Sequence, residues 1–159
     1  MRFLLLSAAL MPLLAVSCSA GEEIACGGDG IVASDAWVRA TQPGQPMSAA
    51  YVSLCNGAAA ADQLVAARFE GATATEIHSS SLSDDGVASM APLADGLELP
   101  AGQSVSLAPG NVHIMLIGLT GALNDGDEPA ITLEFANAPP VTLNFEVRSV
   151  EQAAEHSGH

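Results

Sequence analysis

Two side chains that could bind a soft metal ion stand two residues apart in the run 111–116. They are His113 and Met115, and the run alternates and is rich in strand-forming residues. Residues i and i+2 of a strand point to the same face, so an imidazole and a thioether are expected to project side by side. His78 and Met90 supply the same two donors again. Two imidazoles and two thioethers, without thiolate or carboxylate, favour Cu(I) over zinc, calcium or magnesium.

The competing interpretation is that these methionines only fill space and that both histidines lie on the surface. Removal of an N-terminal signal would leave three methionines, and Met90 and Met115 are two of them. The third, Met47, follows a Pro-Gly loop, where packing is the expected role. His156 and His159 at the C-terminus form a candidate second copper site, since imidazole suits Cu(II), but an incidental polar end is the favoured interpretation.

Composition excludes several classes of partner. The chain has 159 residues, enough for one domain with a core, and only 4% of them are aromatic, so that core must be aliphatic. The net charge is −14, from four arginines and no lysine against 18 acidic residues. No basic patch is possible, so nucleic-acid binding is excluded. The acidity indicates a solvated surface and would also attract cations or basic partners.

The N-terminus is typical of a secretory signal over residues 1–20. Arg2 precedes an apolar stretch from Phe3 to Val16 that is too short to span a bilayer comfortably. Two processing routes fit the residues that follow: lipidation of Cys18, as in a bacterial lipoprotein, or plain cleavage after Ala20. The mature protein is expected to be exported in either case, with contact to a membrane only through a lipid anchor.

Cys26 and Cys55 remain after such processing. In an oxidising compartment, two remaining cysteines most simply form a disulfide. The competing interpretation makes Cys55 a copper thiolate.

Beyond a Gly- and acid-containing linker at 21–30, short apolar or alternating runs are separated by turn residues. Many short strands at regular spacing indicate an all-β sandwich or barrel over residues 31–149. Residues 150–159 are polar and are expected to form a flexible tail containing the two terminal histidines. The predicted strands are Ile31–Ala40, Ala49–Leu54, Gln63–Phe69, Thr75–Ser79, Val87–Met90, Ser104–Leu107, Val112–Ile117, Ala130–Phe135 and Val141–Val147. In the seventh, Val112, Ile114 and Leu116 are expected to face the core, with His113 and Met115 facing outwards.

The order and spacing of these residues resemble the periplasmic copper chaperone family called PCu(A)C. Its motif is His, Met about a dozen positions later, and His-x-Met about two dozen beyond. In this chain His78 and Met90 are 12 positions apart, Met90 and His113 are 23 apart, and His113-Ile114-Met115 follows. The resemblance covers roughly residues 31–148 and extends to further segments: Ala36–Thr41, Ala50–Leu54, Glu76–His78, Leu99–Gly102 and Leu107–Gly110.

The resemblance implies a cupredoxin-like Greek-key β-sandwich in the bacterial periplasm that binds one Cu(I) through His78, Met90, His113 and Met115. It also implies delivery of copper to cytochrome c oxidase or its assembly factors, without a catalysed reaction, and we expect a monomer. Two departures are Ser79, where many members carry Met or Glu, and Cys55, at a place that is often Thr.

Three other functions also fit parts of the sequence. A blue-copper electron-transfer protein needs one Cys thiolate with two His, and Cys55 is the main available thiolate. A hydrolase would need a catalytic triad, for which His78, Ser79 and Asp84 are candidates, but no nucleophile elbow or oxyanion-hole motif accompanies them. An adhesive or structural module would leave His78 and Met90 without a role.

Overall fold

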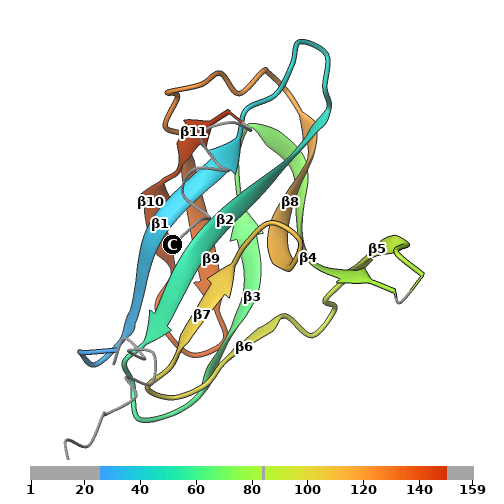
Figure 1. The fold of residues 1–159 in the computed structure, drawn as a ribbon. Coiled ribbons are helices and arrows are strands. Elements are labelled where there is room, and N and C mark those ends of the chain that lie inside the picture. The colour runs from blue at the N-terminus through green and yellow to red at the C-terminus, as the bar shows by residue number, and fades with distance from the viewer. Residues whose placement is uncertain (1–25, 84, 150–159) are drawn as a thin grey trace, which may run out of the picture.

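Two antiparallel-rich sheets packed face to face make up this protein, whose computed structural model describes residues 26–83 and 85–149 (Figure 1). The all-β expectation is confirmed. Within the described ranges there is no helix that is long and apolar enough to cross a membrane. The strands are β1 (Ile31–Arg39), β2 (Met47–Asn56), β3 (Asp62–Arg68), β4 (Ala72–Leu82), β5 (Ala88–Pro92), β6 (Leu97–Leu99), β7 (Ser104–Leu107), β8 (Val112–Leu119), β9 (Ala130–Phe135), β10 (Val141–Asn144) and β11 (Glu146–Arg148).

The larger sheet has the order β11-β1-β2-β8-β4-β5, and β7 also pairs with β2. The smaller sheet has the order β10-β9-β3-β6. Alternation along each strand directs one set of side chains between the sheets, and these are almost entirely aliphatic, as the composition predicts. Their fully buried members include Val38, Leu54, Leu64, Leu99, Ile114, Leu116, Ile131, Leu133 and Phe145.

Two differences from the predicted strands have local causes. β6, only three residues long between Gly96 and Pro100, was not predicted, because so short a run carries little periodic signal. The predicted strand 141–147 is divided at Phe145: β10 pairs with β9 in the smaller sheet, whereas β11 pairs with β1 in the larger one. The alternation of side chains continues across Phe145, so the pattern could not reveal the change of sheet.

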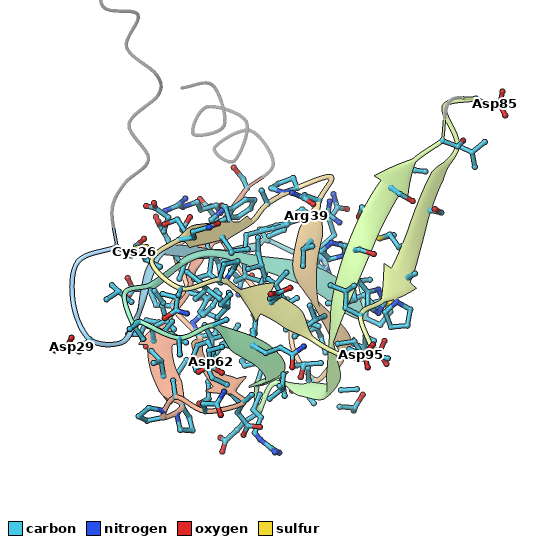
Figure 2. The ribbon with its side chains drawn as sticks, turned by 90° about the horizontal axis from the view of Figure 1, so that it is seen from below. Cys26, Asp29, Arg39, Asp62, Asp85 and Asp95 are labelled. Atoms are coloured by element: carbon cyan, nitrogen blue, oxygen red, sulfur yellow. A yellow bond between two sulfur atoms is a disulfide. The ribbon has the colours of Figure 1, made fainter. Side chains whose placement is uncertain are left out.

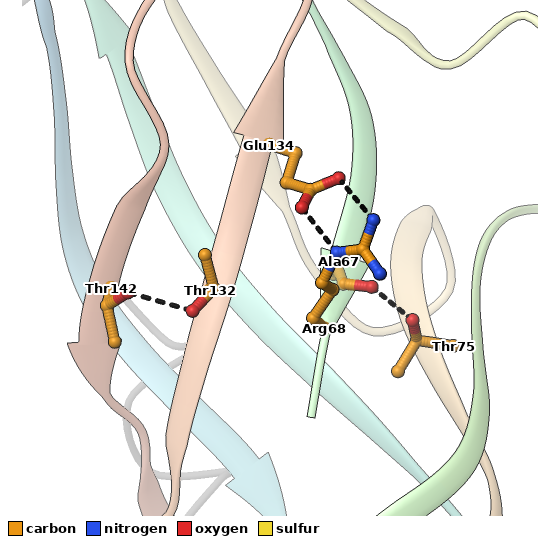
Figure 3. A network of polar contacts seen from close by, with 6 residues as sticks. All are labelled: Ala67, Arg68, Thr75, Thr132, Glu134 and Thr142. Atoms are coloured by element: carbon orange, nitrogen blue, oxygen red, sulfur yellow. Dashed lines mark hydrogen bonds and ion pairs between the residues drawn. The ribbon is translucent and has the colours of Figure 1, made fainter. Parts of the chain in front are cut away.

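Polar contacts connect neighbouring strands around β3, β4 and β9 (Figure 3). The Thr75 hydroxyl of β4 donates to the Ala67 carbonyl of β3, which links the two sheets directly. On the smaller sheet, Arg68 forms an ion pair with Glu134 on the neighbouring strand. The hydroxyls of Thr132 and Thr142 lie 2.8 Å apart across β9 and β10.

The hairpin made by β4 and β5 projects from the sandwich, with Asp85 near its tip (Figure 2). All five residues of β5 are exposed, and β5 is the edge strand of its sheet. Val87 and Met90 expose 63% and 61% of their surface, so neither side chain belongs to the hydrophobic core. β5 is therefore held in place by its hydrogen bonds to β4 and not by side-chain packing against the core.

A disulfide lies at the end of the larger sheet. It joins Cys26, where the described chain begins, to Cys55 near the end of β2, with the two Cα atoms 5.4 Å apart. The predictions made for the signal segment, Cys18, His156 and His159 fall outside the described residues, as does that for Asp84.

Candidate metal centre

The four predicted ligands lie on the outer face of the larger sheet, on three adjacent strands. His78 of β4 pairs directly with His113 of β8. Residues directly opposite in an antiparallel pair share a face, and so do residues two apart in one strand. Met115 therefore shares that face from β8, two residues beyond His113. Met90 of β5 lies opposite Ser80, which is two residues from His78, so the second thioether shares the face too.

The donors form a compact pattern around the two histidines. The ring centroids of His78 and His113 are 6.0 Å apart. Relative to His78, Met115 occupies one diagonal position and Met90 occupies another on the opposite neighbouring strand. Diagonal neighbours in a sheet have Cα atoms about 7–8 Å apart, within reach of long side chains. Side chains up to 37 residues apart in sequence, from His78 to Met115, are thus brought to one surface.

One expectation about this face needs correction. Ile114 and Leu116 face the core as predicted, and both are fully buried. His113 was expected to face outwards to a rim, yet only 5% of its surface is exposed. Its side chain is on the outer face but is covered there by neighbouring rings, since the centroids of Tyr51 and His78 lie 6.3 and 6.0 Å from its own.

The orientation of His113 follows from the turn between β7 and β8. Gly110 has a φ of +77°, a conformation that favours glycine, and it directs the chain back so that the Asn111 N–H bonds to the Ala108 carbonyl. The Asn111 carbonyl then lies 3.1 Å from His113 Nδ1. A carbonyl only accepts, so Nδ1 donates and the lone pair of the neutral ring is on Nε2.

His78 has a carboxylate partner, Glu76, two residues before it on the same face of β4. Glu76 Oε2 lies 2.7 Å from His78 Nε2. The His78 side chain is 15% exposed, whereas that of Glu76 is 49% exposed. Sequence reasoning used Glu76 only as part of a family pattern, although its i−2 spacing from His78 predicts the shared face by the rule applied to His113 and Met115.

An aromatic pair that sequence reasoning did not assign to the site lies beside His113. A bulge in β1, where Asp35 has a φ of +49°, places Trp37 opposite Tyr51 of β2, with ring centroids 4.3 Å apart. Burial raises the pKa of Tyr51, and the nearby positive charge of Arg39 opposes this only in part. The Arg148 guanidinium lies 5.9 Å from the Trp37 ring centre. Of the pair, Tyr51 is the ring that lies against His113, with the two ring centroids 6.3 Å apart.

Other candidate ligands lie elsewhere. Met47 begins β2 opposite Ile117, which lies four residues beyond His113 along β8. Cys55 is four residues beyond Tyr51 in the other direction, and its sulfur is held in the disulfide. Within residues 26–83 and 85–149, no group of three or more His, Cys, Asp or Glu side chains is placed to hold a metal ion.

A cavity of about 600 Å³ lies at the end of the sandwich that holds Asn56 and Asp62. Its wall includes the turn at Pro139 and Pro140 but none of the four predicted ligands. The candidate centre is therefore a surface feature of the larger sheet and not a pocket between the sheets.

Solved structures share this architecture. The copper-bound PCuAC domain from PmoF2 superposes with a TM-score of 0.63 at 24% identity, over 75% of this chain and 92% of that one, which shows the fold. The solution structure of CuI-DR1885 from Deinococcus radiodurans matches with a TM-score of 0.57 at 28% identity, over 81% of this chain and 83% of that one. The fold is thus that of a PCuAC-type domain, a cupredoxin-like β-sandwich.

Sequence relatives define the family more narrowly. The family model described as "Putative lipoprotein LpqE-like" matches residues 31–147. A relative from Leifsonia xyli subsp. xyli, "Putative lipoprotein Lxx21020", is 31% identical over 128 residues, which cover 80% of this chain and 75% of that protein. The chain belongs to this LpqE-like family, within the PCuAC type.

Proposed function

We propose that this protein is an exported copper chaperone that binds one Cu(I) through His78, Met90, His113 and Met115. The observation that carries the proposal is the placement of all four donors on one face of three adjacent strands, with His78 directly opposite His113. The copper-bound form of the PmoF2 domain and the CuI form of DR1885, which share the fold, support copper as the cargo.

The donor types account for the selection of Cu(I). A thioether is neutral and polarizable, so it contributes little to a hard cation and much to Cu(I). Four neutral donors add no charge to compensate that of the ion, which makes the site weaker than a thiolate cage. A moderate affinity suits a protein whose cargo must leave again.

The geometry also suits transfer. His113 is buried and His78 is mostly covered, whereas Met90 is 61% exposed on the projecting hairpin. An acceptor that approaches this hairpin meets Met90 first, so an incoming ligand can replace this thioether while the histidines still hold the ion. The resemblance to PCu(A)C proteins favours cytochrome c oxidase, or a factor that assembles it, as the acceptor.

We further propose that residues 1–20 direct export and that Cys18 becomes the lipidated N-terminus. The lipoprotein family and the Leifsonia relative support this assignment. The disulfide between Cys26 and Cys55 is consistent with an oxidising compartment.

The alternative of a blue-copper electron-transfer protein requires a thiolate ligand. Cys55, the thiolate that this alternative would use, is bonded to Cys26 at the end of the sheet. The chaperone hypothesis uses only donors whose strands are adjacent in one sheet, and the register of these strands supports it.

A Cu(I) titration tests the proposal. Wild type, Met115→Ala and the control Met47→Ala are titrated against bicinchoninate, a chromophoric Cu(I) competitor, under anaerobic conditions. Met47 is also a thioether on this face, but it starts a strand roughly 13 Å along the sheet from the histidine pair. Wild type is expected to bind one Cu(I) per chain.

Met115→Ala should weaken binding by more than about tenfold, because partners outside the ligand shell alone are worth about 10–100-fold. Met47→Ala should bind Cu(I) with the same affinity as wild type. Equal affinities for wild type and Met115→Ala would refute the assigned ligand set.

A further inference from the structure

Each histidine of the candidate centre has one ring nitrogen already engaged. In His113 it is Nδ1, 3.1 Å from the Asn111 carbonyl, which also accepts the Ser80 N–H at 3.1 Å. In His78 it is Nε2, 2.7 Å from Glu76 Oε2. Within the described part of the chain, the second nitrogen of each ring has no such partner. The two rings are thus held through opposite nitrogens.

The engaged nitrogens fix where the lone pairs lie. A carbonyl and an ionised carboxylate only accept hydrogen bonds, so each engaged nitrogen carries a proton. A neutral imidazole then presents its lone pair on the other nitrogen, and a metal ion binds only there. For His113 that nitrogen is Nε2, and for His78 it is Nδ1.

From this geometry, and resting on the proposed function, we propose that Glu76 is a positioning residue for Cu(I). It holds the Nε2–H of His78, so that His78 binds copper through Nδ1 while His113 binds it through Nε2. Metal-bound histidines commonly donate their other N–H to a carboxylate or a backbone carbonyl, which sets the ring orientation and strengthens the donor nitrogen. The site has one partner of each kind.

The placement of Glu76 favours this role over direct ligation. A bond from copper to His78 Nε2 would require the 2.7 Å contact with Glu76 to break. It would also leave a carboxylate beside the ion, a hard donor from which Cu(I) gains little. Retaining the contact lets the carboxylate orient a ring that is mostly covered, while 49% of the Glu76 side chain stays in solvent, where its charge costs little to maintain.

An arrangement in which Glu76 blocks the metal-binding nitrogen of His78 predicts the opposite effect on Cu(I) affinity. If Glu76 occupied the nitrogen that copper needs, the carboxylate would compete with the ion, and its removal would tighten binding. If Glu76 positions the ring, its removal weakens binding. The sign of the change in affinity therefore decides between them.

The structure supplies a matched control. Glu146 lies on the same outer face in β11, bonds to Arg148 at 2.8 Å, and has a side chain that is 52% exposed. Glu146→Ala therefore removes an equally exposed charge from the same sheet. Glu76→Gln keeps an oxygen that accepts the N–H but removes the charge.

The first measurement uses the full mature chain labelled with ¹⁵N. Long-range proton–nitrogen correlation spectra identify the protonated ring nitrogen of each histidine in the apo-protein. Cu(I) is diamagnetic, so the same spectra show which nitrogen shifts on loading. We expect the large ¹⁵N shift at Nδ1 of His78 and at Nε2 of His113. A large shift at Nε2 of His78 would overturn the proposal.

The second measurement is Cu(I) affinity by competition with bicinchoninate. Glu76→Ala should lower the Cu(I) affinity about 10–100-fold, and Glu76→Gln should lower it less. The Cu(I) affinity of Glu146→Ala should stay within about twofold of that of wild type. Unchanged or tighter binding by Glu76→Ala would overturn the proposal.

His78→Ala separates this failure from failure of the proposed function. If His78→Ala weakens binding and Glu76→Ala does not, the ligand set stands and only the positioning role falls. If neither variant changes the affinity, the metal centre itself is wrong.

Discussion

Removal of the disulfide between Cys26 and Cys55 should destabilise the fold without affecting the proposed metal centre. The two cysteines are 29 residues apart, so the bond closes a loop of that size in the unfolded chain. The chain-entropy relation for such a loop gives about 3.6 kcal/mol at 25 °C. We expect the double variant Cys26→Ser/Cys55→Ser to lose roughly 3–4 kcal/mol of the free energy of unfolding.

Urea unfolding followed by circular dichroism measures this loss. Wild type in dithiothreitol should show the same midpoint as the double variant, because both lack the bond. Ser104→Ala is the control, since the Ser104 hydroxyl lies 3.6 Å from Cys26 Sγ and its removal leaves the disulfide intact. A loss below about 1 kcal/mol would refute the loop-entropy argument.

The same variant tests the role of Cys55. Because Cys55 lies at the end of β2 and not among the four proposed ligands, Cu(I) affinity of the double variant should stay within about twofold of wild type. A loss as large as that expected for Met115→Ala would mean that a cysteine sulfur binds the ion, which is the blue-copper alternative.

Three further predictions concern the scaffold, each measured by urea unfolding. Leu116→Ala removes a fully buried side chain and should cost about 2–5 kcal/mol; a loss under 1 kcal/mol would contradict its place in the core. Gly118 has a φ of +65°, and an added Cβ would lie 2.1 Å from Thr73 Oγ1, so Gly118→Ala should cost more than about 1 kcal/mol, whereas Gly121→Ala, with open space around it, should cost less. Burial acts to raise the pKa of Asp62, but hydrogen bonds from three backbone N–H groups outweigh it and hold that pKa below its usual value. The stabilisation is therefore present above about pH 4 and is lost as the pH falls through the lowered pKa, so the stability gap between wild type and Asp62→Asn should close in acid; a gap that widens in acid would show the sign to be wrong.

How far the sequence predicts this structure depends on how local each feature is. Alternation in β8 predicts that Ile114 and Leu116 face the core, because two-residue periodicity is a property of one strand. The burial of His113 is not predictable in this way. It depends on Tyr51 and His78, which belong to two other strands, and the sequence of a single strand does not predict which strands lie beside it.

The candidate site likewise has features that the local sequence predicts and features that depend on how the strands pair. The spacing of His78, Met90, His113 and Met115 predicts a ligand set, but only the register of β4 with β8 and β5 places the four on one face. Glu76 was within reach of sequence reasoning through its spacing from His78. The Trp37–Tyr51 pair was not, since it depends on a one-residue bulge near Asp35 that moves Trp37 opposite Tyr51.

The β4–β5 hairpin has a consequence for how such proteins diversify. Its outer strand contributes no buried side chain, so substitutions there cost little folding free energy. Exposed residues such as Ser89 in this strand and Val87 just before it can therefore change while the aliphatic interior stays as it is, and a chaperone of the proposed kind could adapt to a different acceptor in this way. Engineering of the proposed copper delivery for a new acceptor should begin on the β4–β5 hairpin, with the proposed ligand Met90 kept.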